Sequence, residues 1–114
     1  MWTKPDVQVI CRHNGKKRST QIEGNTYRPR FLWQAKIPWN KKKGFGFTVY
    51  DTNVLKENEV IGRTFINAEK ANELIESEEP AVMKIGDGVG SIMINLYETP
   101  EFLTENIGDS EITE

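Results

Sequence analysis

The amino-acid sequence predicts an all-β protein, an antiparallel β-sandwich with one short helix inserted between its strands. Several short runs alternate apolar with polar residues, the pattern of strands that are buried on one face. Turn signals such as Asn14-Gly15 and the glycine-rich segment 86–90 separate these runs. Residues 68–76 instead show the apolar spacing of a helix. Six or seven short strands joined by turns favour a sandwich.

Each strand is expected where apolar side chains recur at every second position. Val7, Val9 and Cys11 share one face of the first run, and Phe45 and Phe47 share one face of the fourth. Short runs of this kind, bounded by turn residues, are typical of strands in a sandwich. The predicted strands are residues 7–12, 18–22, 31–37, 45–50, 60–66, 82–85 and 91–97.

The helix and the domain limits follow from capping and composition. Asn67 can cap a helix over 68–76, which must end before Pro80. The length of the chain fits a single domain, and we assign that domain to residues 1–100. Residues 101–114 are acidic and contain few apolar residues, so we predict an acidic tail or a linker there.

The charges of the chain are divided between its two halves. Residues 1–50 contain eleven Lys and Arg but two acidic residues, a net charge of +9. The remaining residues contain four bases and fifteen acids, a net charge of −11. This division predicts either two oppositely charged faces or attraction between neighbouring strands.

The sequence offers little support for catalysis. His13 is the one histidine, and it falls in a predicted turn, where we expect it to be exposed. Cys11 lies on the apolar side of its strand and is expected to be a small core residue. The glycine-rich segment 86–90 precedes a strand, whereas a phosphate-binding loop precedes a helix. We therefore expect a protein that is not an enzyme. Because its single cysteine cannot form an internal disulfide, we also expect a reducing, cytoplasmic setting.

A polar loop follows the fourth predicted strand. Asp51, Asn53 and Glu59 place three oxygen-bearing side chains on this loop, and hard cations such as calcium prefer oxygen ligands. The apolar residues Val54 and Leu55 lie between them, near the tip. The loop is therefore a candidate contact with a lipid headgroup layer, and its alternative interpretation is a solvated surface turn.

The order of these signals resembles the C2 domain over roughly residues 4–99. Individually each motif is weak, but four motifs in the right order are fairly specific. The closing run Gly90-Ser-Ile-Met-Ile-Asn-Leu-Tyr97 is similar to the ferlin-type or phospholipase-type topology, which ends in an extra strand. The other motifs are Lys4-Pro-Asp-Val-Gln-Val9, Gly15-Lys-Lys-Arg-Ser-Thr20, Arg28-Pro-Arg-Phe-Leu-Trp33, and the pair Phe47-Thr-Val-Tyr-Asp51 and Glu59-Val-Ile-Gly62.

The resemblance implies a Greek-key β-sandwich of the C2 type. The first strand of the family has no counterpart in this sequence, so we expect a fragment, a divergent domain, or a domain whose missing strand comes from a second copy. An open sheet edge tends to pair with another chain. We therefore expect that a second copy or a protein partner can occupy this edge.

The resemblance also implies where calcium would bind. By analogy with the family, Asp51, Asn53 and Glu59 take the three ligand positions of the later loop. Lys4 takes the position of a facing aspartate, and its ammonium would repel the ion. Calcium is therefore a candidate cofactor, and we expect weak or no calcium dependence.

The resemblance implies a second site on a basic strand face, where C2 domains hold anionic phospholipids. In this sequence it would comprise Arg12, Lys16, Lys17, Arg18 and Lys36. The expected function is that of a cytoplasmic, peripheral membrane module of a larger trafficking or signalling protein. The alternative is a C2-like protein–protein interaction or scaffold domain without lipid or calcium binding.

Nucleic-acid binding is the less favoured use of the basic half of the chain. Single-stranded nucleic acids need exposed aromatic side chains on which bases can stack. Trp33, Phe45 and Phe47 instead fall on the face that the pattern predicts to be buried. We therefore expect no nucleic-acid partner.

Overall fold

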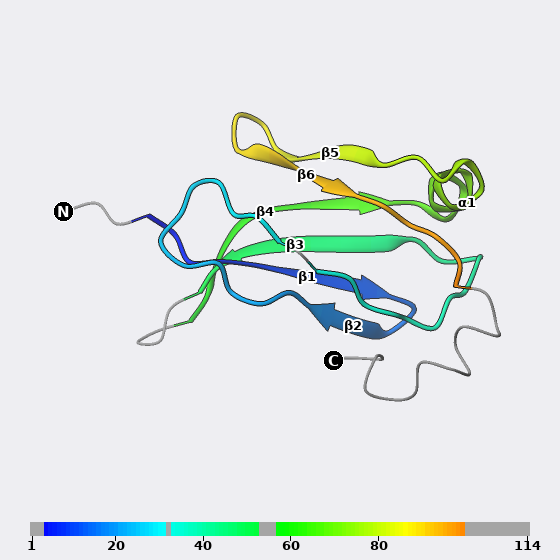
Figure 1. The fold of residues 1–114 in the computed structure, drawn as a ribbon, viewed down its shortest axis with the longest axis horizontal. Coiled ribbons are helices and arrows are strands. Elements are labelled where there is room, and N and C mark those ends of the chain that lie inside the picture. Colours follow the sequence, from blue (N-terminus) through cyan, green and yellow to red (C-terminus); the bar gives the residue numbers. More distant parts are fainter. Residues whose placement is uncertain (1–3, 32, 53–56, 100–114) are drawn as a thin grey trace.

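Four antiparallel strands form the main sheet of the protein (Figure 1). The structure is a computed structural model that describes residues 4–31, 33–52 and 57–99. The strands lie side by side in the order β2-β1-β3-β4. Two further strands form a separate hairpin, and one helix connects the two sheets. The elements are β1 (Val7–His13), β2 (Lys16–Ser19), β3 (Phe45–Asp51), β4 (Glu59–Ile66), α1 (Ala68–Ser77), β5 (Ala81–Gly86) and β6 (Gly90–Ile94).

The β1–β2 hairpin turns at Asn14 and Gly15, as the sequence predicts. Both residues have positive φ angles, 50° and 78°, which a two-residue turn of type I′ requires. The return strand starts at Lys16, two residues before the predicted start at Arg18. This shift follows from the tightness of the turn, because pairing begins with Lys16 directly opposite His13.

The β5–β6 hairpin forms the second layer of the sandwich and approaches the main sheet at Gly62. A side-chain carbon at Gly62 would overlap the carbonyl oxygen of Ile85, so glycine permits the close approach of β5 to β4. Ile85 itself is buried, whereas Val82 and Met93 face outward and are exposed. The predicted antiparallel sandwich with one helix between strands is therefore confirmed.

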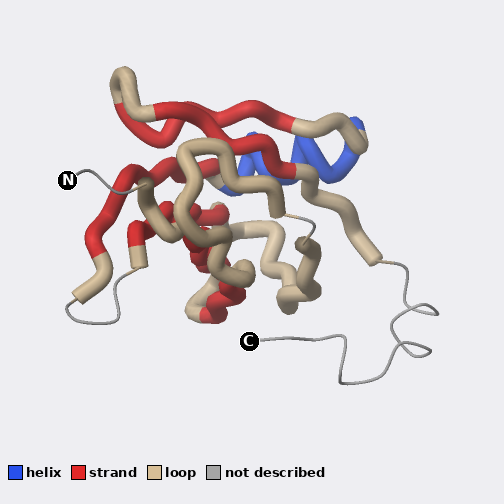
Figure 2. Tube along the Cα trace, turned by 60° about the vertical axis from the view of Figure 1, so that its left-hand side comes forward, coloured by secondary structure: helices blue, strands red, loops and turns tan. Residues whose placement is uncertain are grey.

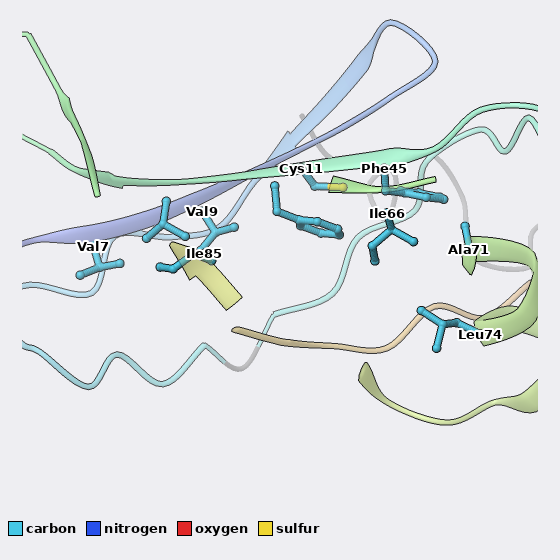
Figure 3. Close-up of a cluster of buried hydrophobic side chains, with 10 residues drawn as sticks. Val7, Val9, Cys11, Phe45, Ile66, Ala71, Leu74 and Ile85 are labelled. Atoms are coloured by element: carbon cyan, nitrogen blue, oxygen red, sulfur yellow. The ribbon is translucent and has the colours of Figure 1, made fainter. Parts of the chain in front are cut away.

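The core lies between the inner face of the main sheet, the hairpin and the helix. Figure 3 shows side chains of β1 and β3, Ile66 and Ile85 gathered below the sheet, with Ala71 and Leu74 reaching in from α1. Every second residue of β1 and β3 is buried, which confirms the period of two in both predicted strands. The ten buried hydrophobic residues are Val7, Val9, Cys11, Phe45, Phe47, Val49, Ile66, Ala71, Leu74 and Ile85.

Helix α1 begins as the sequence predicts and ends one residue later. The side chain of Asn67 accepts a hydrogen bond of 2.8 Å from the amide of Lys70 and so satisfies one free donor of the first turn. The helix stops where Glu78 adopts a left-handed conformation, with a φ of 61°. The Glu78 amide donates to the Leu74 carbonyl at 3.0 Å, which closes the last turn. Figure 2 shows the helix in blue, joined to the following strand by a short loop.

The predicted strand over 31–37 is wrong, since residue 31 and residues 33–37 are not in a strand. The carbonyl of Lys36 accepts a hydrogen bond from the Arg18 guanidinium at 2.8 Å, and Gln34 accepts one from the Tyr97 hydroxyl at 2.7 Å. The Arg18 side chain thus takes a backbone bond that a ladder partner would have made, whereas the Gln34–Tyr97 bond joins two side chains. Phe31 and Ile37 nevertheless pack against the core. The alternating apolar residues of segment 31–37 thus belong to an irregular segment that covers the core.

We expect Gly62→Ala to destabilise the fold by about 2 kcal/mol, because the added methyl group forces β4 away from β5. Urea unfolding monitored by circular dichroism measures the change. Gly46→Ala is the matched control in β3, since a methyl group there would lie 3.8 Å from Phe65 in ordinary contact. Equal losses for the two variants would contradict the close approach of β5 to β4.

Burial raises the pKa of the Cys11 thiol from 9.0 to about 11, and the charge of nearby Arg18 opposes this rise. In the unfolded chain the thiol ionises near 9, while in the folded chain it keeps its proton up to about 11. Deprotonation therefore favours the unfolded state, and we expect stability to fall across this pH window by roughly 2–3 kcal/mol through Cys11.

Comparison with Cys11→Ala separates this effect from the titration of lysines and tyrosines. The difference in unfolding free energy between the two proteins, measured from pH 8 to pH 11, should change with pH in favour of the variant. A difference that stays constant with pH would show that the thiol ionises equally in both states.

Candidate functional site

Three basic side chains lie on the outer face of the main sheet, which is the face turned away from the core. Arg12 of β1 pairs directly with Lys17 of β2, and both are exposed. Arg63 of β4 points to the same side, because its cross-strand partner Thr48 alternates with the buried residues of β3. Arg63 is also exposed. We call Arg12, Lys17 and Arg63 the basic face.

Two members of the basic face, Arg12 and Arg63, adjoin Thr48. The guanidinium of Arg12 donates to the Thr48 hydroxyl at 3.4 Å, and Thr48 is the direct cross-strand partner of Arg63. The outer positions of the paired strands include no aspartate or glutamate among the described residues; they are Gln8, Ile10, Arg12, Lys17, Ser19, Gly46, Thr48, Tyr50, Val60, Arg63 and Phe65. The basic face is therefore positive without a neighbouring countercharge.

An exposed aromatic ring borders the basic face. Phe65 is 64 % exposed and pairs with Gly46, which in turn pairs with Arg12. Because Gly46 has no side chain, the ring extends over the β3 backbone, 3.8 Å from where a methyl group would stand. The outer face thus combines three cations with an apolar group at one edge.

The other predicted members of the basic site do not share this face. Lys16 and Arg18 point to the opposite side of β2 from Lys17, because neighbouring residues of a strand alternate. Arg18 is 5 % exposed and donates to the carbonyls of Lys36 and Lys17 at 2.8 and 2.9 Å. The ammonium nitrogen of Lys36 is buried and has no hydrogen-bond partner within the described residues. The expectation of one shared face is therefore wrong for Lys16, Arg18 and Lys36.

The predicted calcium loop begins with a carboxylate that supports the backbone. Asp51 accepts a hydrogen bond from the amide of Asp6 at 3.0 Å, and Asp6 accepts one from the amide of Asn25 at 2.7 Å. Glu59 lies opposite Asp51 at the start of β4. The two aspartates thus fasten the chain segments at this end of the molecule to each other.

Asn53, Val54 and Leu55 lie outside the described residues. Within the described parts of the chain, no three carboxylate, histidine or cysteine side chains are grouped closely enough to hold a metal ion. Lys4, which was expected to face the calcium loop, has its ammonium 6.0 Å from the centre of the Tyr27 ring. A cation–π contact at this distance keeps the Lys4 ammonium near Tyr27.

His13 is buried, and the prediction of an exposed turn residue is wrong. Its side chain is 1 % exposed and stacks on Phe45 with ring centroids 4.0 Å apart. Nδ1 lies 2.9 Å from the carbonyl of Gly44, and Nε2 accepts from the amide of Asn40 at 2.9 Å. A carbonyl can only accept and an amide can only donate, so these bonds define a neutral imidazole with its proton on Nδ1.

Arg63 and Phe65 are the residues of the outer face that reasoning from sequence missed. The predicted strand 60–66 already placed both residues at alternate positions of one strand. Their alignment with Arg12 depends on the β3–β4 register, which includes a shift between Val49 and Tyr50. A shift of this kind moves side chains between faces and has no local sequence signal here.

Comparison with known proteins supplies the family. No curated protein matches the chain. Within the described residues, no helix is long and apolar enough to cross a membrane. The model of the C2 domain family matches residues 2–83, and C2 domains are generally non-catalytic modules that bind membrane phospholipids. The match spans more than half of the chain and agrees with the antiparallel sandwich, so the protein belongs to the C2 domain family.

Proposed function

We propose that this C2 domain docks on anionic phospholipids through its basic face, with weak or no calcium dependence. The lipid phosphates would lie between Arg12, Lys17 and Arg63, and Phe65 would enter the headgroup layer beside them. We place the domain at residues 1–100 of a larger trafficking or signalling protein, at the cytoplasmic surface of a membrane.

The observation that carries this proposal is the direct pairing of Arg12 with Lys17. Side chains directly opposite on neighbouring strands have Cβ atoms about 5 Å apart, and like charges at this distance destabilise the sheet. The outer positions of the described strands supply no carboxylate that could offset this repulsion. An anion bound between the two cations would remove the repulsion and satisfy both.

The size of the basic face fits reversible binding. Each Lys or Arg near an anionic leaflet contributes about 1 kcal/mol, so three residues contribute roughly 3 kcal/mol. A contribution of this size increases the affinity by about two orders of magnitude and is weakened by salt. The domain would therefore bind anionic membranes reversibly, and other contacts or further domains would strengthen the association.

The weak calcium dependence is supported by how Asp51 is used. Calcium needs six to eight oxygen ligands. The Asp51 carboxylate already accepts the Asp6 amide, and the Asp6 carboxylate already accepts the Asn25 amide. Each aspartate thus already uses one carboxylate oxygen to hold the loops together.

The test is co-sedimentation with phosphatidylcholine vesicles that either contain or lack phosphatidylserine. We expect binding that requires phosphatidylserine, is similar in calcium and in chelator, and decreases as salt is raised. Arg12→Glu combined with Lys17→Glu should reduce the affinity by at least about thirtyfold, because two favourable contributions are lost and two repulsive charges are added.

The matched control is Lys70→Glu combined with Lys84→Glu, which changes the net charge equally on α1 and β5. This control should retain binding. Equal losses in both double variants would show non-specific electrostatic attraction and no defined site on the basic face. Binding that requires calcium would instead indicate a site in the 51–59 loop. Absence of binding to every vesicle would leave the scaffold function.

A protein-interaction function is the alternative, and one observation favours it. Val82 and Met93 pair directly across the β5–β6 hairpin and are both exposed. Apolar side chains that adjoin on the outer face of a two-stranded sheet are typical of a contact surface. This function would apply if the vesicle experiments showed no membrane binding.

A further inference from the structure

A groove with aromatic walls and acidic edges lies at the end of the molecule where α1 stops. It has a volume of about 460 Å³, which is in the range of ligand-binding pockets. Trp39 and Tyr97 line it together with Ile75 of the helix. Its carboxylates come from Glu76 and Glu78 at the end of α1, and from Glu98 after β6.

The aromatic residues of the groove are held in place by hydrogen bonds. Asn40, which follows Trp39, donates its amide to the buried His13 at 2.9 Å. The next carbonyl, that of Lys41, accepts a hydrogen bond from the side chain of Asn72 in α1 at 3.0 Å. Tyr97 donates its hydroxyl to Gln34 at 2.7 Å. Trp39 and Tyr97 remain 40 % and 56 % exposed, so two positioned rings are presented to solvent.

The groove has an uncompensated negative charge. Glu76, Glu78 and Glu98 have no ion-pair partner among the described residues, and Lys41 is the one basic residue of the lining. The last turn of α1 also includes no basic residue. Carboxylates at the C-terminal end of a helix lie at the negative end of its dipole, where cations are favoured. A bound cation would relieve the repulsion among the glutamates and the repulsion between them and the negative end of the helix dipole.

An unused hydrogen-bond acceptor lies at the same place. The side-chain nitrogen of Asn72 must face the Lys41 carbonyl, because that carbonyl can only accept. The side-chain oxygen of Asn72 is left buried, with no hydrogen-bond partner in the described structure. A buried acceptor of this kind normally has a donor. The Asn72 oxygen is closed to solvent, while the lining presents three glutamates against one lysine.

We propose that this groove binds a basic peptide segment of a protein partner, with a Lys or Arg side chain between Trp39 and Tyr97. Aromatic faces attract such cations, and the three glutamates offset their charge. This proposal does not rest on lipid binding.

The position of the groove favours a protein over a lipid headgroup. Helix α1 packs Ala71 and Leu74 into the core, on the inner side of the main sheet. The basic face lies on the outer side of that sheet. Figure 1 also places α1 at the opposite end of the molecule from the point where β3 ends and β4 begins. A membrane on the basic face would therefore leave the groove open to a partner.

The test is fluorescence anisotropy of a labelled hexa-arginine peptide titrated with the full chain. We expect saturable binding with one peptide per chain, and no binding of a labelled hexaglutamate peptide. Glu76→Gln, Glu78→Gln and Glu98→Gln together should weaken binding at least about tenfold, as should Trp39→Leu alone. Thermal unfolding of each variant confirms that the loss is not one of folding.

The matched control is Glu57→Gln, Glu69→Gln and Asp87→Asn, which changes the net charge equally at exposed positions outside the groove. Its affinity should stay within about twofold of the unmodified chain. An equal loss in both triple variants, or no binding at all, would overturn the proposal. Capture of pure phosphatidylcholine vesicles that the groove variants abolish would also overturn it, since the ligand would then be a choline headgroup.

Discussion

The hydrogen bonds of the neutral His13 imidazole are the interactions on which both the main sheet and the groove depend. The imidazole stands at the end of β1, stacks on Phe45, and binds the backbone at both Asn40 and Gly44. These two bonds fix the connection that brings the chain from the second strand to the third. An amide and a carbonyl buried without these partners would each cost roughly 1–3 kcal/mol. One side chain therefore positions β3 in the sheet and Trp39 in the groove.

Local patterns in the sequence predicted much of the fold. Alternation in β1 and β3, the hairpin turn at Asn14, and the Asn67 cap of α1 all depend on near neighbours, and all are confirmed. Residues 31–37 show the same alternation, yet they form no strand where they are described. Alternation reports which side chains face the core, and an irregular segment that covers the core can satisfy it equally well.

The candidate sites were harder to predict because they depend on register and on distant contacts. Three successive basic residues starting at Lys16 look like one cluster in sequence, but a strand must send Lys17 to one side and Arg18 to the other. Arg63 joins Arg12 only through the shifted β3–β4 register. The groove depends on contacts between segments that lie more than 20 residues apart, such as Tyr97 with Gln34. No local pattern reports such contacts.

The separation of charge between the outer sheet face and the end of α1 gives the domain a permanent electric dipole. Near an anionic leaflet, the surface field falls off within a Debye length, so it acts on the nearer charges more strongly than on the distant ones. If the domain docks as proposed, the field would exert a torque that turns Arg12, Lys17 and Arg63 toward the membrane and the glutamates of the helix end away from it. Rotational alignment would then precede contact, and a larger fraction of diffusive encounters would be productive.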